Sequence, residues 1–454
     1  MFKKILIANR GEIAVRIIRA CKELKIKTVA VYSTADANSL HVHWADEAVC
    51  IGPPPPKDSY LHSLNIISAA LITGCEAIHP GIGFLSERPS FAEACEAHGL
   101  KFIGPSAAAM DRMGDKAEAR ETMRAARVPV IPGSNGAITS EHEAIEFAKK
   151  VGYPVLIKAS LGGGGRGIRL VQNDEELPRQ LDLAKNEALS SFGNPDVYME
   201  KFVEEPRHIE VQVFGDEHGH VVHLGERECS IQNHRHQKVL EEAPAANLTP
   251  SQRSKIGDAA VNAAKAIGYA NAGTVEFLMD KRGDFYFLEM NKRLQVEHCI
   301  TEMVTGLDLV KLQLSVAAGE KLPFVQKEVK WEGHAIECRI NAEDPEKNFI
   351  PSAGVIERVV LPGGLGVRVD THIVAGNEVP PYYDPLIAKV IAWGKNRAEA
   401  IARMERCMSE MEVVGVKTNI AFQQRILANA FYRRGDITTD FIQRRLTGDT
   451  SKKG

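Results

Sequence analysis

The run Glu289-Met-Asn-Lys-Arg-Leu-Gln-Val-Glu-His298 decides which fold class we expect. Side chains alternate across a β-strand, so a strand here places carboxylates, amides and a guanidinium on one face. The residues of that face are Glu289, Asn291, Arg293, Gln295 and Glu297. Such a row suits a metal and phosphate site that grades into an anion site. The alternative is the polar outer face of an edge strand, which is common in antiparallel sheets.

The segment before this run predicts a partner strand. Gly273-Thr-Val-Glu-Phe-Leu-Met279 is β-like, residues 280–284 are typical of a turn, and Phe285-Tyr-Phe-Leu288 leads into Glu289. Glu276 and Glu289 then lie on neighbouring strands. Mg²⁺ accepts carboxylate and amide oxygens and also binds substrate phosphates. We therefore predict Glu276, Glu289 and Asn291 as metal ligands.

The composition is that of an ordinary globular protein. The 454 residues are 25% charged and 44% hydrophobic, with a net charge of -3, which gives no reason to expect a nucleic-acid partner. No apolar run approaches the roughly 18 residues of a transmembrane helix, and the short run after Lys4 predicts a first strand, not a signal peptide. Eight scattered cysteines without a Cys-x-x-Cys pair predict reduced thiols in the cytoplasm.

The first 110 residues alternate short apolar runs with helical patterns, which predicts a parallel sheet built from βαβ units. The first turn, Asn9-Arg-Gly-Glu12, lacks the Gly-x-Gly-x-x-Gly fingerprint, so a dehydrogenase loses its main support. The glycine-rich turn at residues 79–87 follows a predicted strand, where open α/β sheets bind ligands.

A second unit begins near Gly114 and contains a glycine run. Predicted helices over residues 117–126 and 141–150 precede the strand Pro154-Val-Leu-Ile-Lys158, and Gly162-Gly-Gly-Gly-Arg-Gly167 follows. Consecutive glycines let backbone N–H groups curl around phosphates, although a flexible hairpin tip is the alternative. Residues 197–203 predict a strand that offers backbone groups to an adenine base, and an ordinary connecting strand explains them equally well.

The next segments predict one more strand, a loop and a third unit. Residues 208–214 alternate strictly, so His208, Glu210 and Gln212 share a strand face. Residues 227–238 are rich in cations and amides, and we expect a loop that either borders an anion site or is simply solvated. Strands over 334–341 and 355–361, a segment over 380–393 that leads into a strand, and an amphipathic helix over 398–411 predict an α+β unit.

Taken together, several motifs resemble biotin carboxylase of the ATP-grasp superfamily. They are Asn9-Arg-Gly-Glu-Ile-Ala14, Met113-Gly-Asp-Lys116, residues 162–167, His236-Gln-Lys238, residues 289–298, Cys338-Arg-Ile-Asn-Ala-Glu-Asp-Pro345 and Tyr382-Tyr-Asp-Pro-Leu-Ile-Ala-Lys389. The resemblance covers nearly the whole chain. It implies an α/β and α+β fold with a parallel-sheet domain (1–113), an ATP-grasp domain (114–325, with a lid at about 132–203) and a C-terminal domain (331–446).

The resemblance also implies a reaction. An ATP-dependent carbon–nitrogen ligase would phosphorylate bicarbonate to carboxyphosphate, and the CO₂ released would carboxylate biotin on a separate carrier protein. The implied ATP contacts are Lys116, Lys158, Gly164, Gly165, Glu200, Lys201, Phe202, Val203, His208 and His236. Glu276, Glu289 and Asn291 would bind Mg²⁺, with Mn²⁺ as a substitute. Lys238, Arg293, Gln295 and Val296 would form the bicarbonate pocket, Glu297 would be the general base, and Arg339 would stabilise the biotin enolate.

Geometry and three departures set limits on this assignment. An ideal extended strand separates Arg293 from Glu297 by about 13 Å, too far to hold one small ion, and the resemblance implies a bend after Gln295. Ile82 stands where the family usually has Tyr, which concerns the biotin side, and Lys292 replaces a small residue or Pro. One extra residue separates Gln232 from His236.

Two other functions remain open, and partners are implied. One alternative is an ATP-grasp ligase with another acceptor, and the other is a non-catalytic nucleotide-binding subunit. The sequence has no Ala-Met-Lys-Met biotinylation motif, so the biotin carboxyl carrier protein and the carboxyltransferase would be separate chains. The resemblance implies a homodimer, with Arg19 and Glu23 at the interface, and we expect neither nucleic-acid nor membrane partners.

Overall fold

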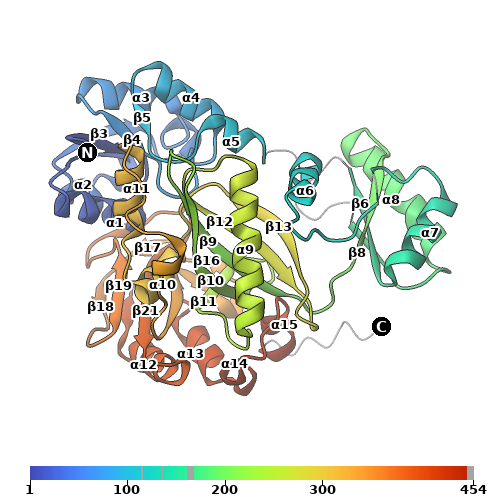
Figure 1. The fold of residues 1–454 in the computed structure, drawn as a ribbon. Helices are drawn as coiled ribbons and strands as arrows, with labels where there is room; N and C mark the ends of the chain where they lie inside the picture. Colours follow the sequence, from blue (N-terminus) through green and yellow to red (C-terminus); the bar gives the residue numbers. More distant parts are fainter. Residues whose placement is uncertain (114–115, 135, 161–167, 447–454) are drawn as a thin grey trace. The chain divides into compact units, whose positions relative to one another are not determined.

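The computed structural model describes residues 1–113, 116–134, 136–160 and 168–446, without the side chains of residues 116, 117, 191 and 192 (Figure 1). The chain forms two compact units, which we treat separately. The first comprises residues 1–128, 207–277 and 289–454, and the second comprises residues 129–206 and 278–288. Within the described ranges, no helix has both the length and the apolar character that a membrane crossing requires.

A five-stranded parallel sheet opens the first unit, in the order β3-β2-β1-β4-β5. Its strands are β1 (Lys4–Ile7), β2 (Lys27–Ser33), β3 (Glu47–Gly52), β4 (Ala77–His79) and β5 (Lys101–Phe102). Five helices connect or follow them: α1 (Gly11–Glu23), α2 (Leu40–Trp44), α3 (Ser63–Ile72), α4 (Pro89–Ala97) and α5 (Ala107–Asp111). The predicted parallel sheet is confirmed. Ile5 and Ile7 enter one core and Leu6 the other, as strand alternation requires.

The loops that leave β1 and β4 meet at the point where the order of the strands in this sheet reverses. Asn9 Nδ2 donates to the carbonyl oxygens of Pro80 and Ile82, both at 2.8 Å. A Cβ on Gly81 would come within 2.7 Å of the Asn9 amide, so only glycine allows this approach. The glycine-rich turn is therefore tied to the first loop at the position where α/β sheets place ligands.

An eight-stranded sheet lies mostly in the first unit, in the order β13-β12-β9-β10-β11-β14-β21-β19. Its strands are β9 (Arg207–Gly215), β10 (Val221–Gln232), β11 (Lys238–Ala243), β12 (Asn271–Met279), β13 (Phe285–Asn291), β14 (His334–Asn341), β19 (Val367–Thr371) and β21 (Leu386–Gly394). The helices of this part are α6 (Lys116–Ala125), α9 (Pro250–Ala266), α10 (His298–Thr305), α11 (Leu309–Ala317), α12 (Arg397–Glu410), α13 (Ile420–Ala428), α14 (Ala430–Arg434) and α15 (Phe441–Arg445).

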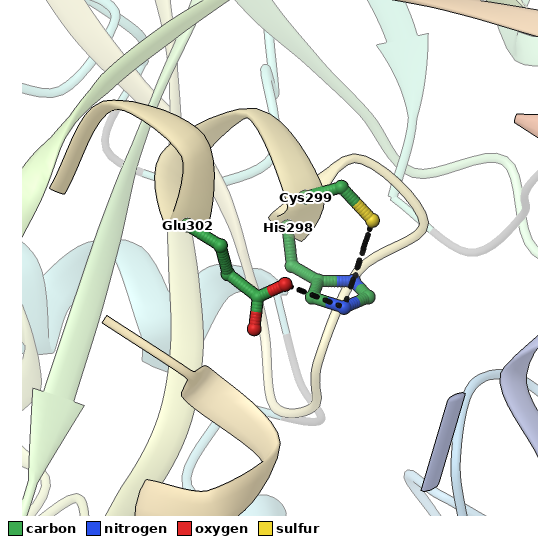
Figure 2. Close-up of side chains that lie close together, drawn as sticks. All are labelled: His298, Cys299 and Glu302. Carbon is green, nitrogen blue, oxygen red and sulfur yellow. Dashed lines mark hydrogen bonds and ion pairs between the residues drawn. The ribbon is translucent and has the colours of Figure 1, made fainter. Parts of the chain in front are cut away.

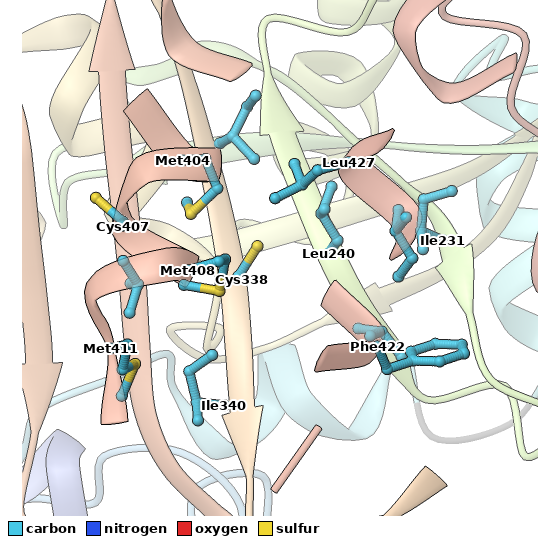
Figure 3. Close-up of a cluster of buried hydrophobic side chains, with 14 of the residues drawn as sticks. Ile231, Leu240, Cys338, Ile340, Met404, Cys407, Met408, Met411, Phe422 and Leu427 are labelled. Atoms are coloured by element: carbon cyan, nitrogen blue, oxygen red, sulfur yellow. The ribbon is translucent and has the colours of Figure 1, made fainter. Parts of the chain in front are cut away.

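The two faces of this sheet differ around β11 and β14. Figure 3 shows Leu240, Cys338 and Ile340 among side chains of α12 and α13, and all three are buried in one apolar cluster. Because side chains alternate, Glu337 and Arg339 lie on the opposite face, which α10 covers. One face of β14 is thus a hydrophobic core, and the other carries charged groups.

The second unit is a small antiparallel sheet with two helices. Its strands are β6 (Val155–Ala159), β7 (Ile168–Val171) and β8 (Val197–Lys201), in the order β7-β6-β8, and its helices are α7 (Glu141–Val151) and α8 (Leu177–Phe192). Val155 and Ile157 of β6 are fully buried against apolar residues of both helices. The glycine run that we predicted as a phosphate loop, residues 162–167, lies outside the described residues.

Three predictions of local structure are wrong. The strand predicted to reach His298 ends at Asn291, and α10 begins at His298. The predicted loop over 227–238 is mostly strand, because β10 continues to Gln232 and β11 starts at Lys238. The predicted strand over 355–361 is divided into β17 (Gly354–Val355) and β18 (Arg358–Val360), which pair with different partners.

Candidate functional site

Lys238 is the centre of a buried cluster of charges in the first unit. Its Nζ donates to Glu210 Oε2 at 2.6 Å, Glu276 Oε1 at 2.9 Å and Glu297 Oε1 at 2.7 Å. The three carboxylates come from β9, β12 and the residue before α10. Burial opposes the charge on the ammonium, but the carboxylates raise the pKa of Lys238 well above its usual value. The lysine is therefore a permanent cation that draws three acids together.

Glu297 is held by two cations, one at each oxygen. Lys238 bonds Oε1, and Arg339 Nη2 donates to Oε2 at 2.9 Å. Arg339 is itself fixed through its Nε, which donates to Glu241 Oε1 at 2.6 Å. Burial alone would raise the pKa of Glu297, but Lys238, Arg339 and Arg227 hold it well below its usual value. Glu297 is thus an ionised carboxylate that can accept a proton from a bound substrate.

The chain reaches this arrangement by turning after Asn291. Glu87 accepts the backbone N–H of Lys292 at 2.9 Å and Arg293 Nε at 2.8 Å. These contacts hold residues 292–293 as the strand ends, and the following turn returns Glu297 to Lys238. The bend therefore occurs earlier than the one expected after Gln295. Because the chain turns here, Arg293 and Glu297 are not separated by the full length of an extended strand.

Arg227 organises the floor of the site although it is fully buried. Its guanidinium donates to Glu210 Oε1 at 2.5 Å, Gln212 Oε1 at 2.7 Å and Gln295 Oε1 at 3.0 Å. Gln295 in turn donates its Nε2 to Glu276 Oε1 at 3.0 Å. A planar guanidinium with several fixed acceptors is a rigid support, so Arg227 sets where the carboxylates of β9 and β12 can lie.

The predicted metal ligands lie on the expected strands. Glu276 is on β12, and Asn291 Nδ2 donates to its Oε1 at 2.9 Å. Glu289, two residues before Asn291 on β13, is exposed. Two carboxylates and an amide oxygen are hard donors of the kind that Mg²⁺ prefers, so the donor chemistry fits this ion. In the present arrangement Asn291 Oδ1 accepts Arg293 Nη2 at 2.9 Å.

Among the predicted nucleotide contacts of the first unit, His208 lies beside the cluster and His236 in a turn. His208 Nε2 is 3.2 Å from Glu276 Oε2, and its Nδ1 is 3.1 Å from Gln232 Nε2. His236 is exposed, with a φ of 59° between β10 and β11. The extra residue noted in the sequence thus belongs to this turn.

Other predicted contacts lie in the second unit or outside the description. Lys158 of β6 and Glu200 of β8 form an ion pair, and Lys201 donates to the carbonyl oxygens of Gly152 and Tyr153 at 2.8 and 2.9 Å. Phe202 and Val203 follow the end of β8. Gly164 and Gly165 lie outside the described residues, as does the Lys116 side chain. Val296 uses its carbonyl to accept Lys389 Nζ at 2.8 Å.

Four supporting residues were not predicted: Glu87, Glu210, Arg227 and Glu241. A signal existed for Glu210, which the alternation of β9 already placed on the face of His208. Arg227 was hidden because a segment so rich in polar residues suggested a loop. Glu87 and Glu241 act through contacts more than 90 residues away in sequence, which no local pattern shows.

A second cluster of ligand-type residues lies at the start of α10. Figure 2 shows His298, Cys299 and Glu302 close together, with His298 Nε2 3.7 Å from both the Cys299 sulfur and Glu302 Oε2. However, Arg368 Nη1 bonds Glu302 Oε2 at 2.7 Å, and Lys389 Nζ lies 3.1 Å from the Cys299 sulfur. Cations already occupy the places that a metal ion would take, so we interpret this cluster as an ion-pair network that anchors α10.

Three families match successive parts of the chain. The biotin carboxylase N-terminal domain matches residues 1–110, the ATP-binding domain of the carbamoyl-phosphate synthase L chain matches residues 115–325, and the biotin carboxylase C-terminal domain matches residues 337–444.

Individual relatives and solved structures match over nearly the full length. Biotin carboxylase 1 of Bacillus subtilis (strain 168) is 56% identical over 98% of both chains. The biotin carboxylase of Haemophilus influenzae is 52% identical over 98% of this chain and 99% of its own. The crystal structure of the 2-oxoglutarate carboxylase biotin carboxylase domain dimer of Hydrogenobacter thermophilus, in complex with MgADP, ADP and bicarbonate, has a TM-score of 0.88 at 52% identity and covers 98% of both chains.

Proposed function

The chain belongs to the biotin carboxylase family, and from this premise we propose that it uses ATP and bicarbonate to carboxylate biotin on a separate carrier protein. The proposal depends on one observation: Lys238 and Arg339 each donate a hydrogen bond to a different carboxylate oxygen of Glu297. One ionised base between two cations, in a buried site, suits a reaction that removes a proton and then develops negative charge.

Each residue of the cluster has a distinct role in this proposal. Arg293 offers a planar fork that matches two bicarbonate oxygens, and Lys238, Gln295 and Val296 complete the pocket. Glu297 takes the bicarbonate proton, and the bicarbonate oxygen attacks the γ-phosphorus of ATP to give carboxyphosphate and ADP. Carboxyphosphate then decomposes to CO₂ and phosphate. The released phosphate takes the N–H proton of the biotin ureido group, Arg339 stabilises the negative charge that develops on the ureido oxygen, and the deprotonated ureido nitrogen attacks CO₂.

Mg²⁺ would be held by Glu276, Glu289 and Asn291, and when bound it would neutralise charge on the ATP phosphates. We assign ATP binding to Lys116, Lys158, Gly164, Gly165, Glu200, Lys201, Phe202, Val203, His208 and His236. The ion pair between Lys158 and Glu200 supports the second unit's part in this assignment, because it keeps a cation near the end of β6.

The proposal extends to domains, partners and location. We propose domain limits of 1–113, 114–325 and 331–446, a cytoplasmic homodimer, and a biotin carboxyl carrier protein and a carboxyltransferase on separate chains. The proposed interface residues, Arg19 and Glu23, are both on α1. In the structure, Glu23 pairs with Lys311 at 2.5 Å and Arg19 lies 3.8 Å from Asp370. Sedimentation at micromolar concentration tests the dimer, and a monomer would contradict it.

The deciding experiment measures ADP release from MgATP and bicarbonate, with and without free biotin. We expect a rate that requires bicarbonate and rises with biotin. Turnover without any effect of biotin would favour a ligase with another acceptor. ATP binding without any turnover would favour a non-catalytic nucleotide-binding subunit. Both outcomes contradict the proposal, and they are told apart by the rate in the absence of biotin.

A further inference from the structure

Glu337 is a buried acid that the proposed mechanism does not use. It lies on β14, directly opposite Glu241 of β11 in the antiparallel register, and both residues are 0% exposed. Neither carboxyl oxygen of Glu337 has a hydrogen-bond partner among the residues that the structure describes, and the same holds for Glu241 Oε2. A buried ionised carboxylate without partners is strongly unfavourable, so this pair of acids needs an explanation.

The surrounding charges do not supply a counter-ion for Glu337. The titratable and charged groups that influence it come from β11, β14, β21, the residue before α10 and the first turn of α10. They are Glu241, Cys338, Arg339, Lys389, Glu297 and Cys299. Arg339 already bonds Glu241 and Glu297. Lys389 Nζ is occupied by Val296 O at 2.8 Å, the Cys299 sulfur at 3.1 Å and Glu12 Oε1 at 3.2 Å. Both cations are thus committed elsewhere.

Electrostatics agrees with the geometry. Burial raises the pKa of Glu337 well above its usual value, and Glu241 and Glu297 raise it further against the opposing effect of Lys389 and Arg339. Burial also raises the pKa of Glu241 to about 7, with Arg339 opposing. Because Arg339 bonds Glu241 directly, Glu241 is the member of the pair that ionises first, and Glu337 is the member that keeps its proton.

Resting on the proposed function, we infer that Glu337 is a positioning residue that stays a neutral carboxylic acid and shares its proton with Oε2 of Glu241. A protonated carboxyl group is a hydrogen-bond donor, and Glu241 Oε2 is the acceptor left open on the facing strand. Side chains directly opposite in an antiparallel pair are close enough for such a bond after a change of rotamer.

While Glu337 is neutral, it adds no further negative charge that would offset the positive charge of Arg339. With Glu337 neutral, Arg339 faces two carboxylates, Glu241 at its Nε and Glu297 at its Nη2. Once Glu297 has taken a proton from bicarbonate, only Glu241 remains ionised, so the Nη2 side of Arg339 is free to stabilise a new negative charge on biotin. An ionised Glu337 would add another anion behind Arg339 and weaken that stabilisation.

Infrared difference spectroscopy of the ligand-free protein in D₂O at pH 8 tests the protonation state directly. We expect the carbonyl band of a protonated carboxylic acid in the wild type and the loss of one such band in Glu337→Gln. The matched control Glu320→Gln, at an exposed position on the same unit, should keep it. Absence of any such band in the wild type overturns the inference whether or not the variant folds. If Glu337→Gln does not fold, Glu241→Gln must instead shift the frequency of the band, and an unshifted band overturns the inference.

Kinetics tests the positioning role. Glu337→Gln, which mimics the neutral acid, should keep kcat for biotin-dependent ADP release within about threefold at pH 7.5 and should lose less activity than the wild type at alkaline pH. Glu337→Ala should lower kcat about tenfold with an unchanged KM for ATP. Equal losses in the two variants, or equal alkaline profiles for wild type and Glu337→Gln, contradict the inference. The infrared spectrum does not depend on turnover, so it tests the protonation of Glu337 separately from the proposed function. The proposed function is contradicted if the wild type shows no biotin dependence.

Discussion

The two faces of β14 carry opposite kinds of side chain on one short strand. Ile336, Cys338 and Ile340 enter an apolar cluster with α12 and α13, while Glu337 and Arg339 face α10 and the charged site. The apolar face needs only close packing, because dispersion attraction and the hydrophobic effect do not depend on the direction of the contact. The charged face depends on specific partners for each group. A substitution on the apolar face can therefore change the stability of the protein without changing its catalysis. A substitution on the charged face changes both.

Removing the base should produce the largest effect. Glu297→Gln keeps the size of the side chain and the hydrogen bond from Arg339 but cannot accept the bicarbonate proton. We expect kcat for biotin-dependent ADP release to fall by about 10³-fold, with ATP affinity unchanged by calorimetry. The exposed Glu320→Gln is the control. A loss of less than tenfold would show that another group is the base.

A cavity in the apolar face should change stability only. Ile336→Ala removes a fully buried side chain and should lower the free energy of unfolding by about 3 kcal/mol, measured by urea denaturation. The kcat of the folded variant should match the wild type at 20 °C, since Ile336 belongs to the apolar cluster on the face of β14 opposite to Glu337 and Arg339. A drop in kcat comparable to that of Glu297→Gln would mean that the two faces are coupled.

The charged face should give the protein an acid-sensitive stability. Burial alone would raise the pKa of Glu302, but His298, Arg16 and Arg368 lower it to about 2. A carboxylate with a lowered native pKa stabilises the fold above its unfolded pKa of about 4.3, and this contribution is lost as pH falls toward 2. The urea midpoint of Glu302→Gln should thus fall less steeply between pH 4.5 and 3 than that of the wild type. Parallel slopes would contradict the assigned ion pairs.

The smallest effect is expected at Ile82, which belongs to neither face of β14. Its side chain is half-buried against the N-terminal core, and its carbonyl is held by Asn9. Restoring the residue usual in the family, Ile82→Tyr, should change the KM for free biotin by no more than about threefold. The KM for ATP serves as the internal control. A tenfold change in the biotin KM would show that this turn contributes directly to biotin affinity.

Sequence reasoning succeeded where a pattern is local. The short apolar run around Leu6, followed by a helical pattern, is enough to predict a buried parallel strand. The predicted hairpin placed Glu276 on the strand next to that of Asn291, where the two side chains meet. It failed at Arg227, because a fully buried guanidinium has the same sequence signature as an exposed one. It also failed at Lys292 and Arg293, where the strand ends because Glu87, 205 and 206 residues away, accepts their N–H groups. Partners at such distances come from the tertiary fold.

The pairing of β11 with β14 has a consequence for how the chain can be divided. These strands lie about 90 residues apart in sequence, yet Leu240–Cys338 through Ala243–Ala335 are joined in one continuous ladder. A cut in the segment between α11 and β14 would leave each fragment with an open row of unpaired N–H and C=O groups, flanked by apolar side chains. Open edges of this kind invite aggregation. The C-terminal part holds three of the eight strands, β14, β21 and β19, and is therefore expected to be soluble only when it is produced together with its partner strand β11.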